Sequence, residues 1–486
     1  MNGEISFTTP RLPLMAPGLQ PAAKHAEVFA PYDRSLIATV EQADRAGVDQ
    51  ALETAYGLFR NRDAWLSPAR RIEILERTGA IMQGCRNQLA LLAAREGGKP
   101  LIDSQVEVDR AIDGVKLCGE HLRTQAGREI PMNLNTASTG RVAFTQYEPI
   151  GVVVAFSAFN HPLNLIVHQV GPAVAAGCPV IVKPAEATPL SCMRFVEILR
   201  EAGLPEEWCQ ALLTTDRDVA GTLMSDPRVG FFSFIGSARV GWMLRSKLAP
   251  GTRCALEHGG AAPVLIAADA DLNEAVPRLA KGGFYHAGQV CVSVQRAFAH
   301  QSIARNLAQR LAERAKSLTV GDPTKADTEV GPLIRPAEVK RVDEWVKEAV
   351  NGGAQLLCGG ETLSASCYSP TVLFDPPGGA RVSTEEIFGP VVCVYPFDAI
   401  EEAIARANAL PFAFQAAVFT RDLDTALRAS ERLDASAVMV NDHTAFRMDW
   451  MPFAGLRQSG LGVGGIPYTI RDMQIEKMTV IRSREL

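Results

Sequence analysis

The chain has 486 residues, of which 47% are hydrophobic and 21% charged, and its 49 Lys and Arg against 54 Asp and Glu leave a formal net charge of −5. This composition is typical of a soluble globular protein of roughly two or three domains, and the lack of a basic tract argues against nucleic acid or a membrane surface as a partner. No N-terminal signal segment and no run of about 18 apolar residues occurs, so we expect a cytoplasmic protein.

The predicted elements begin with an extended arm over residues 1 to about 30, which is rich in proline and small residues. From residue 35 to about 125, apolar residues three and four apart predict a layer of helices, one of them with Ser67 as N-cap and Pro68 as first residue. From Pro149 to about residue 440, short β-branched runs alternate with helical segments. This alternation predicts βαβ units and parallel sheets covered on both faces.

Two segments fit neither series. Residues 127–148 and 473–483 both have the character of strands, which could pair with each other or with another subunit.

Ten cysteines are spread along the chain without a Cys-x-x-Cys motif or the Cys and His spacing of a metal site. Neither a metal site nor a disulfide framework is therefore predicted, and most cysteines are expected in the core. Cys291 is a candidate exception because it lies in the small-residue stretch "GGFYHAGQVCVSV", where a thiolate could meet a substrate. Taken alone, the stretch favours an inert core cysteine.

Two polar residues follow predicted strands. Glu257 ends the strand in "RCALEHGG", at the edge where open α/β sheets place their clefts, although it could also be a surface residue in a turn. Asn160 follows an apolar strand in "AFSAFNHP", where its amide could hold a developing oxyanion or could simply cap the next helix.

Together these segments resemble the aldehyde dehydrogenase superfamily from about residue 30 to the C-terminus. Eight motifs occur in the family's order: FNHP, VKPAEATP, FIGSARVG, LEHGG, GQVC, EEIFGP, VN and PFAGLRQSGLG. The resemblance implies an α/β fold with a Rossmann-type cofactor domain, an α/β catalytic domain and a small β oligomerisation arm. The implied boundaries are an NAD-binding domain over 1–125 and 148–257, a catalytic domain over 258–440, and bridging, oligomerisation and tunnel-closing segments over 126–147 and 441–486, in a homodimer or homotetramer.

The resemblance also implies the catalytic roles. Cys291 matches the nucleophile that forms a thiohemiacetal with the aldehyde, and Asn160, with the Cys291 amide, matches the oxyanion hole. Glu257 matches the base that activates water to hydrolyse the resulting thioester.

NAD is the implied cofactor, and a carboxylate at Glu186 beside the adenosine ribose favours it over NADP. The residues that match cofactor contacts are Phe159, Lys183, Glu186, Gly236, Ser237, Gly241, Glu386 and Phe388. The chain departs from the family at Gly464, where many members have a second glutamate, and at Gln169, which replaces a lysine. Glu257 is then the only candidate base of its type.

Three residues of the implied substrate tunnel are basic: Arg110, His161 and Arg447. Such a cluster is costly to desolvate without an anion, so we expect a short aldehyde with an anionic tail. Within the superfamily, the C-terminal tract looks most like phosphonoacetaldehyde dehydrogenases, which form phosphonoacetate. Alternatively, Arg110 pairs with Asp109 or Asp113, Arg447 pairs with Asp442 or Asp449, and His161 is a neutral packing residue.

Other substrates and classes stay open. Sulfoacetaldehyde, succinate semialdehyde, glyceraldehyde 3-phosphate and lactaldehyde are alternatives, and a CoA-acylating dehydrogenase is a further one. A cysteine hydrolase without a redox cofactor would use the same thioester but would need a histidine partner. A structural protein built on this fold would be expected to lose Cys291 or Glu257, and both are present.

Overall fold

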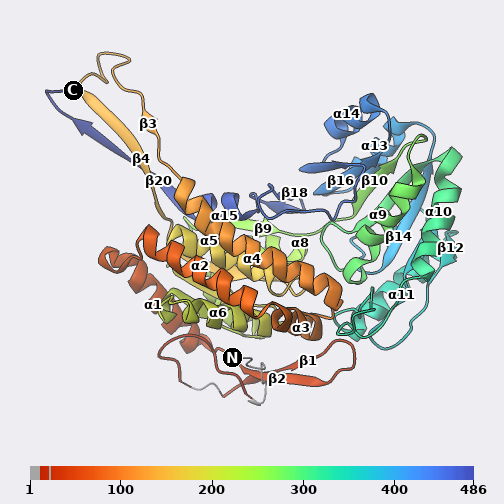
Figure 1. The fold of residues 1–486 in the computed structure, drawn as a ribbon, viewed down its shortest axis with the longest axis horizontal. Helices are drawn as coiled ribbons and strands as arrows, with labels where there is room; N and C mark the ends of the chain where they lie inside the picture. Colours follow the sequence, from red (N-terminus) through yellow and green to blue (C-terminus); the bar gives the residue numbers. More distant parts are fainter. Residues whose placement is uncertain (1–10, 21–22) are drawn as a thin grey trace.

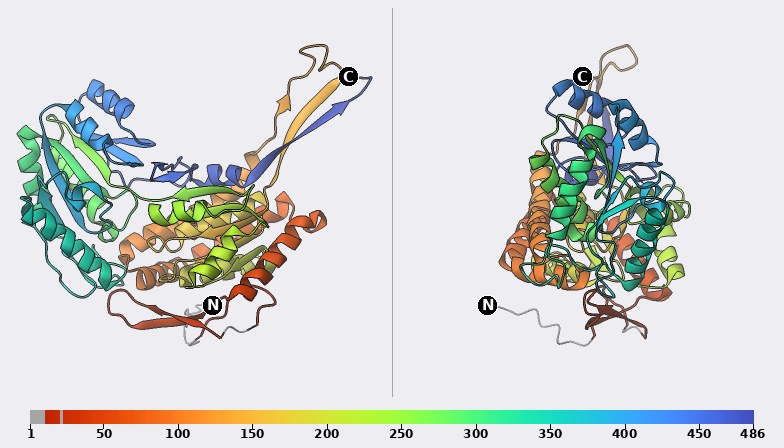
Figure 2. Two further views of the ribbon diagram at one scale, coloured as in Figure 1. Left: turned by 180° about the vertical axis from the view of Figure 1, so that it is seen from behind. Right: turned by 90° about the vertical axis from the view of Figure 1, so that its right-hand side faces the viewer.

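The computed structural model describes residues 11–20 and 23–486. It contains two α/β bodies, each with its own sheet, and a long β arm that projects from the first body (Figures 1 and 2). This is the α/β aldehyde dehydrogenase fold that the sequence predicts. The division into domains at the stated boundaries stays a prediction.

The first body is built on a six-stranded sheet of order β19-β9-β8-β5-β6-β7. All five residues of β5 are buried, as expected for a parallel strand covered on both faces. The strands are β5 (Val152–Phe156), β6 (Val180–Lys183), β7 (Cys209–Ala211), β8 (Val229–Ile235), β9 (Arg253–Glu257) and the short antiparallel β19 (Gly460–Leu461).

Helices cover this sheet on both faces. Val153 and Ala155 of β5 pack into one apolar cluster, and Val152 and Val154 pack into another, because successive side chains of a strand point to opposite faces. The helices of this body are α1 (Arg45–Arg60), α2 (Pro68–Gly84), α3 (Arg86–Gly97), α4 (Leu101–Thr124), α5 (Asn164–Ala176), α6 (Leu190–Glu201), α7 (Arg217–Ser225), α8 (Ala238–Arg245) and α15 (Ile466–Asp472).

The start of α2 confirms the sequence prediction, because Ser67 accepts a hydrogen bond from the Arg70 amide and Pro68 is the first helical residue. The start of the predicted helical layer was wrong. Leu36–Glu41 is a strand, β2, paired antiparallel with β1 (His25–Phe29). Its β-branched residues favour a pleated surface, and the following helix begins only at the Asp44 N-cap. The predicted arm over 1–30 lies partly outside the described residues.

The second body has a seven-stranded sheet of order β12-β13-β14-β11-β10-β16-β17, parallel except for β12. Its strands are β10 (Ala262–Ile266), β11 (Val294–His300), β12 (Gln355–Cys358), β13 (Thr371–Phe374), β14 (Val391–Phe397), β16 (Gln415–Phe419) and β17 (Ala437–Val440). Its helices are α9 (Leu272–Phe284), α10 (Gln301–Lys316), α11 (Pro336–Asn351), α12 (Arg381–Thr384), α13 (Ile400–Asn408) and α14 (Leu423–Arg432).

The arm confirms that the two unassigned segments pair with each other. Strand β20 (Gln474–Arg482) lies antiparallel to β4 (Arg141–Pro149) along its whole length, and β3 (Glu129–Ile130) adds a third strand. A two-stranded ladder, β15 (Phe412–Ala413) with β18 (Leu456–Arg457), links the C-terminal segment to the second body. Oligomerisation through the arm stays a prediction. Within the described residues, no helix has the length and apolar character needed to cross a membrane.

A buried ion pair holds α4 against the start of α5. The Lys99 Nζ atom lies 2.5 Å from the Glu107 carboxylate, and their side chains are 0% and 1% exposed. The other Glu107 oxygen accepts hydrogen bonds from the amides of Leu163 and Asn164 at the first turn of α5. Glu107 therefore caps α5 from a neighbouring helix and fixes the loop just before it, which carries Asn160 and His161.

We expect Lys99→Met to lower the free energy of unfolding by roughly 3–5 kcal/mol, because it leaves the Glu107 carboxylate buried without its counter-charge. Urea unfolding followed by circular dichroism measures the change. The matched control is Lys116→Met on the same layer, whose ammonium is half exposed and 3.8 Å from Asp113. The control should stay within about 0.5 kcal/mol of wild type. Equal effects of the two substitutions would contradict the role of the buried pair.

Candidate active site

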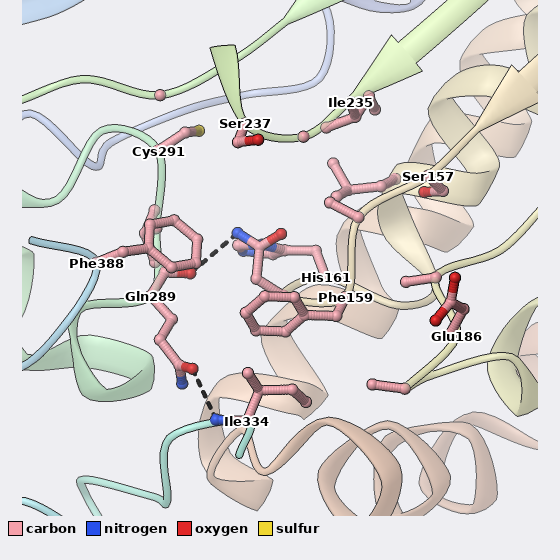
Figure 3. A pocket seen from close by; sticks show the side chains of 18 of the residues that line it. Ser157, Phe159, His161, Glu186, Ile235, Ser237, Gln289, Cys291, Ile334 and Phe388 are labelled. Carbon is pink, nitrogen blue, oxygen red and sulfur yellow. Dashed lines mark hydrogen bonds between the residues drawn. The ribbon is translucent and has the colours of Figure 1, made fainter. Parts of the chain in front are cut away.

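A cavity of about 1430 Å³ lies between the two bodies. It exceeds the roughly 300–1,000 Å³ that holds one drug-sized ligand, so it has room for a dinucleotide and a small aldehyde. Figure 3 shows its loops meeting: Phe159 and His161 come from one, Gln289 and Cys291 from a second, and Phe388 from a third. The predicted site residues that line it are Arg110, Phe159, Asn160, His161, Lys183, Glu186, Gly236, Ser237, Glu257, Cys291, Glu386, Phe388 and Arg447.

Cys291 sits in a tight turn between α9 and β11, closed by a hydrogen bond from the Ser293 amide to the Val290 carbonyl. The chain enters this turn through two left-handed residues, His286 and Ala287, followed by Gly288. A Cβ atom at position 288 would overlap the Gly389 carbonyl, so only glycine fits there. The backbone thus presents the thiol to the cavity on a loop that is packed on both sides.

Asn160 is held by the same turn. Its side-chain amide donates to the Gln289 carbonyl at 2.9 Å. Gln289 is itself fixed, since its side-chain oxygen accepts from the Ile334 amide at 2.9 Å. An asparagine amide has two N–H donors, so one orients the group and the second stays available for an oxyanion.

The Cys291 thiol is protonated in the free cavity. Burial raises its pKa to about 12, while the nearby Arg447 cation lowers it and the Glu257 carboxylate raises it. A thiol is a poor nucleophile compared with its thiolate, so the cysteine needs a base when it reacts.

Glu257 is the base that the geometry offers. It ends β9 and lines the cavity with Cys291, and burial raises its pKa, which the Arg447 cation partly offsets. A carboxylate with a raised pKa is a stronger proton acceptor. Gly464 lies directly against it, and a Cβ atom there would overlap the Glu257 carboxyl. The missing second glutamate therefore leaves the space that the Glu257 side chain occupies.

The cofactor half of the cavity has the features that a dinucleotide requires. Strand β8 runs into Gly236 and Ser237, and α8 begins at the next residue, which aims backbone N–H groups into the cleft. Across the cleft the Glu386 carboxyl fills the space beside Gly259 and accepts from the Gly260 amide at 3.1 Å. Burial raises its pKa to about 7. The residues present fit the cofactor.

The remaining cofactor residues frame this cleft. Lys183 ends β6, and its Nζ atom lies 3.9 Å from Glu186, which is largely exposed. The rings of Phe159 and Phe388 meet edge to face with centroids 5.9 Å apart. Gly241 does not line the cavity. It lies within α8, where any side chain would overlap the His258 ring.

Arg110 is neutralised by a carboxylate that lies far away in the sequence. Its guanidinium donates two hydrogen bonds to Asp449, at 2.7 and 3.1 Å. Asp449 also contacts His168 at 2.7 Å and the Asn164 amide at 3.3 Å. Although burial raises the Asp449 pKa, the hydrogen bonds from His168 and Arg110 and the charge of Arg110 hold it well below its usual range. The alternative pairing of Arg110 with Asp109 or Asp113 is wrong.

Arg447 has no ion-pair partner among the described residues, although the Glu257 carboxylate acts on it from further away and raises its pKa. Its guanidinium stacks on the Phe453 ring at 3.6 Å and reaches the His168 ring nitrogen Nδ1 at 3.4 Å. Among the described residues no carboxylate lies within ion-pair distance of it, and its Nε atom has no hydrogen-bond partner. The alternative pairing with Asp442 or Asp449 is therefore wrong. Burial lowers the Arg447 pKa, which shows the cost of keeping this cation out of water.

His161 is a neutral group and does not add to the positive charge. Its side chain is buried, and burial together with the Lys99 cation and other nearby positive groups lowers its pKa well below the usual range. Its Nε2 atom makes a 2.5 Å hydrogen bond with the Tyr285 hydroxyl. The expectation of three basic groups converging on an anion is thus corrected to one cation without an ion-pair partner, Arg447.

Sequence reasoning did not select Gln289 or Tyr285, and it considered Asp449 only as a partner of Arg447. Gln289 and Tyr285 lie within the Cys291 stretch itself, so their closeness to the nucleophile was a usable signal. The pairing of Arg110 with Asp449 spans 339 positions and carries no local signal.

Comparison with known proteins matches residues 19–479 to the aldehyde dehydrogenase family. A 3-sulfolactaldehyde dehydrogenase from Priestia megaterium is 36% identical over 94% of this chain and 95% of its own length. A lactaldehyde dehydrogenase from Methanocaldococcus jannaschii is 33% identical over 94% of this chain and 97% of its own.

Solved structures agree with this match. Aldehyde dehydrogenase 21 from Physcomitrella patens, in complex with the reaction product succinate, superposes with a TM-score of 0.92 at 34% identity and covers 96% of this chain and 97% of its own. The glyceraldehyde-3-phosphate dehydrogenase GapN from Methanocaldococcus jannaschii, complexed with NADP, has a TM-score of 0.89 at 32% identity, covering 95% of this chain and 100% of its own.

We expect the rate of Cys291 alkylation by iodoacetamide to rise roughly tenfold per pH unit between about pH 7 and 9, because the thiolate fraction grows in that way below a thiol pKa of about 12. Mass spectrometry of the peptide that contains Cys291 separates it from the other cysteines. Arg447→Met should slow the reaction at every pH, since losing the cation raises the thiol pKa further. A plateau in the rate near pH 8 would contradict the buried, protonated thiol.

Proposed function

Because the chain belongs to the aldehyde dehydrogenase family, an enzyme family that oxidises aldehydes to acids with a nicotinamide nucleotide, we propose that its substrate is a short aldehyde with a singly charged anionic tail and that NAD is its cofactor. The observation that carries the proposal is Arg447, a half-buried guanidinium that lines the same cavity as Cys291 and has no ion-pair partner among the described residues.

In the proposed reaction, Cys291, Glu257 and Asn160 each have a separate role. Glu257 accepts the thiol proton as Cys291 sulfur bonds to the carbonyl carbon, and the free N–H of Asn160 with the Cys291 amide holds the alkoxide of the thiohemiacetal. A nicotinamide nucleotide bound beside Glu386 and Phe388 would supply the hydride acceptor that converts the thiohemiacetal to a thioester. Glu257 gives up the thiol proton to solvent and then takes a proton from water as the water oxygen attacks the thioester carbon. The carbon–sulfur bond breaks, the acid leaves, and the Cys291 sulfur regains a proton.

The charge of the tail follows from counting the groups around it. Arg110 and Asp449 cancel, and His161 and His168 are neutral because burial lowers their pKa. Arg447 contributes a positive charge that the Glu257 carboxylate offsets only from beyond ion-pair distance. One carboxylate or sulfonate balances one guanidinium and matches its planar donors. A phosphonate or phosphate near neutral pH brings up to about two charges, and the second would stay buried without a partner.

The names of the relatives include a sulfonate-bearing aldehyde and a product with two carboxylates, but also lactaldehyde, which has no charged tail, and a phosphorylated substrate. The choice of a singly charged tail therefore rests on Arg447. Phosphonoacetaldehyde, the first choice from the sequence, has no support among them, and we therefore favour the sulfonate and carboxylate alternatives.

The preference for NAD rests on Glu186. In the proposed complex its carboxylate faces the adenosine ribose, where it would accept hydroxyl groups and repel a 2′-phosphate. Lys183 beside it is positive, but its ammonium is largely buried and lies toward Glu186.

We expect Arg447→Met to lower kcat/KM for succinate semialdehyde at least roughly 30-fold more than for butanal, because a buried charge pair is worth about 2 kcal/mol or more. A panel of phosphonoacetaldehyde, sulfoacetaldehyde, succinate semialdehyde and butanal, followed by NADH absorbance, measures the ratios in both enzymes. A higher Cys291 pKa would slow the oxidation of both aldehydes equally. The ratio of kcat/KM for succinate semialdehyde to that for butanal therefore reports only the effect of the anionic tail.

The matched control is Arg428→Met, which removes a half-exposed arginine on α14 paired with Glu401. It should leave every ratio within about twofold. If wild type had its highest kcat/KM with butanal, the anionic tail would be refuted. If phosphonoacetaldehyde were the best substrate, the single-charge argument would fail.

We expect Glu186→Gln to raise the ratio of kcat/KM for NADP to that for NAD roughly tenfold, about 1.4 kcal/mol, because it removes the repulsion of the 2′-phosphate. Initial rates with each nucleotide at saturating aldehyde give the ratio. Glu197→Gln on α6, an exposed partner of Arg194, is the control. A wild-type enzyme that prefers NADP would contradict the assignment.

A further inference from the structure

The cavity contains a polar pair that the reaction does not use. The Tyr285 hydroxyl and the His161 Nε2 atom lie 2.5 Å apart, and both residues line the cavity with Cys291. Neither group is charged, because burial lowers the pKa of His161 and raises that of Tyr285. No step of aldehyde oxidation requires a neutral tyrosine and histidine at this place.

The pair borders the reacting carbon. His161 follows Asn160, whose amide marks the position of the carbonyl oxygen. Tyr285 packs with Cys291 against one apolar cluster made of Val290, Val292, Phe414 and Phe453. When the aldehyde carbon of a short substrate is bonded to the Cys291 sulfur, the carbon next to it therefore lies beside these two polar side chains.

The hydrogen-bonding capacity of the pair suits a hydroxyl group. If Tyr285 donates to His161, the tyrosine oxygen keeps a lone pair and the histidine Nδ1 carries a proton; if the histidine donates, the tyrosine proton is free. In both tautomers one donor and one acceptor remain for a ligand. A hydroxyl both donates and accepts, whereas a carboxylate or sulfonate only accepts and would face a lone pair in this place.

The Tyr285 ring is also held in position. The Lys281 ammonium lies 5.2 Å from the ring centre and is itself paired with Asp103. The rings of His161 and Tyr285 meet edge to face with centroids 6.0 Å apart. A fixed hydroxyl discriminates between ligands better than a mobile one, since less freedom is lost on binding.

We propose that Tyr285, oriented by His161, binds a hydroxyl group on the carbon next to the aldehyde, so that the substrate is a 2-hydroxyaldehyde. The inference rests on the proposed function for the chemistry of the site and adds a second recognition element to the tail pocket. Tyr285 contacts the substrate, and His161 is a positioning residue.

The test compares aldehydes that differ only in this hydroxyl. One pair carries a sulfonate tail, 3-sulfolactaldehyde and 3-sulfopropanal, and the other has no tail, lactaldehyde and propanal. The readout is the ratio of kcat/KM for the hydroxylated member to that for its partner. Wild type should favour the hydroxylated member of each pair roughly tenfold, and Tyr285→Phe should abolish most of that preference while it keeps the ring.

Variants of His161 test the positioning role. His161→Phe should lower the ratio as Tyr285→Phe does, whereas His161→Gln, which keeps a donor and an acceptor, should retain it within about threefold. Tyr32→Phe, which removes the hydroxyl of an exposed tyrosine, is the matched control. A ratio that is unchanged in Tyr285→Phe overturns the inference, and a ratio that is unchanged in His161→Phe overturns the positioning role.

The outcomes separate this inference from the proposed function. A wild-type enzyme that does not favour the hydroxylated member of either pair overturns the inference, whatever the effect of the tail. A hydroxyl preference without any preference for the sulfonate tail supports the inference and refutes only the anionic tail. Turnover of none of the four aldehydes overturns both.

Discussion

The burial of ionisable groups governs the chemistry of this cavity. Cys291, Glu257 and Arg447 face one another in an enclosed space, where burial favours the neutral form of each. The thiol and the carboxyl consequently have raised pKa values, and the single cation lowers both. When a proton passes from Cys291 to Glu257, the negative charge moves from the carboxylate to the sulfur. Because the Arg447 cation stabilises both anions, the charge stays near the same counter-charge during the transfer.

Asp449 determines how much positive charge the cavity presents. Without it, Arg110 and Arg447 would be two like charges in one enclosed space, which is costly unless a ligand carries two negative charges. Asp449 lies in the loop between β17 and β18 and binds Arg110 of α4 together with Asn164 and His168 of α5. The loop and the two helices are thereby fastened together by the contact that cancels one of the charges.

The sequence was sufficient for the fold and for the identity of the candidate site, and it failed where contacts are long-range or depend on burial. The αβ alternation, the Ser67 cap and the pairing of the two arm strands follow from local patterns. The sequence predicts a helix over residues 36–41 because their apolar residues continue the helical spacing of the segment that follows. Their β-branched side chains favour a strand instead, and a strand is what the structure has. The basic character of His161 was misjudged, because its protonation depends on neighbours such as Lys99 that only the fold brings close.

Two neighbouring side chains, Glu257 and His258, each fit because the residue packed against them is a glycine. The histidine in "EHGG" fits because Gly241 of α8 has no side chain, and its ring donates to the Gln458 carbonyl, which also accepts from the Trp242 indole. The adjacent Glu257 fits because Gly464 has none either. Gly464 of the C-terminal segment thus makes room for Glu257 at the end of β9, and Gly241 of α8 makes room for His258, the next residue. The position of the Glu257 carboxyl consequently depends on how the C-terminal segment packs on the first sheet.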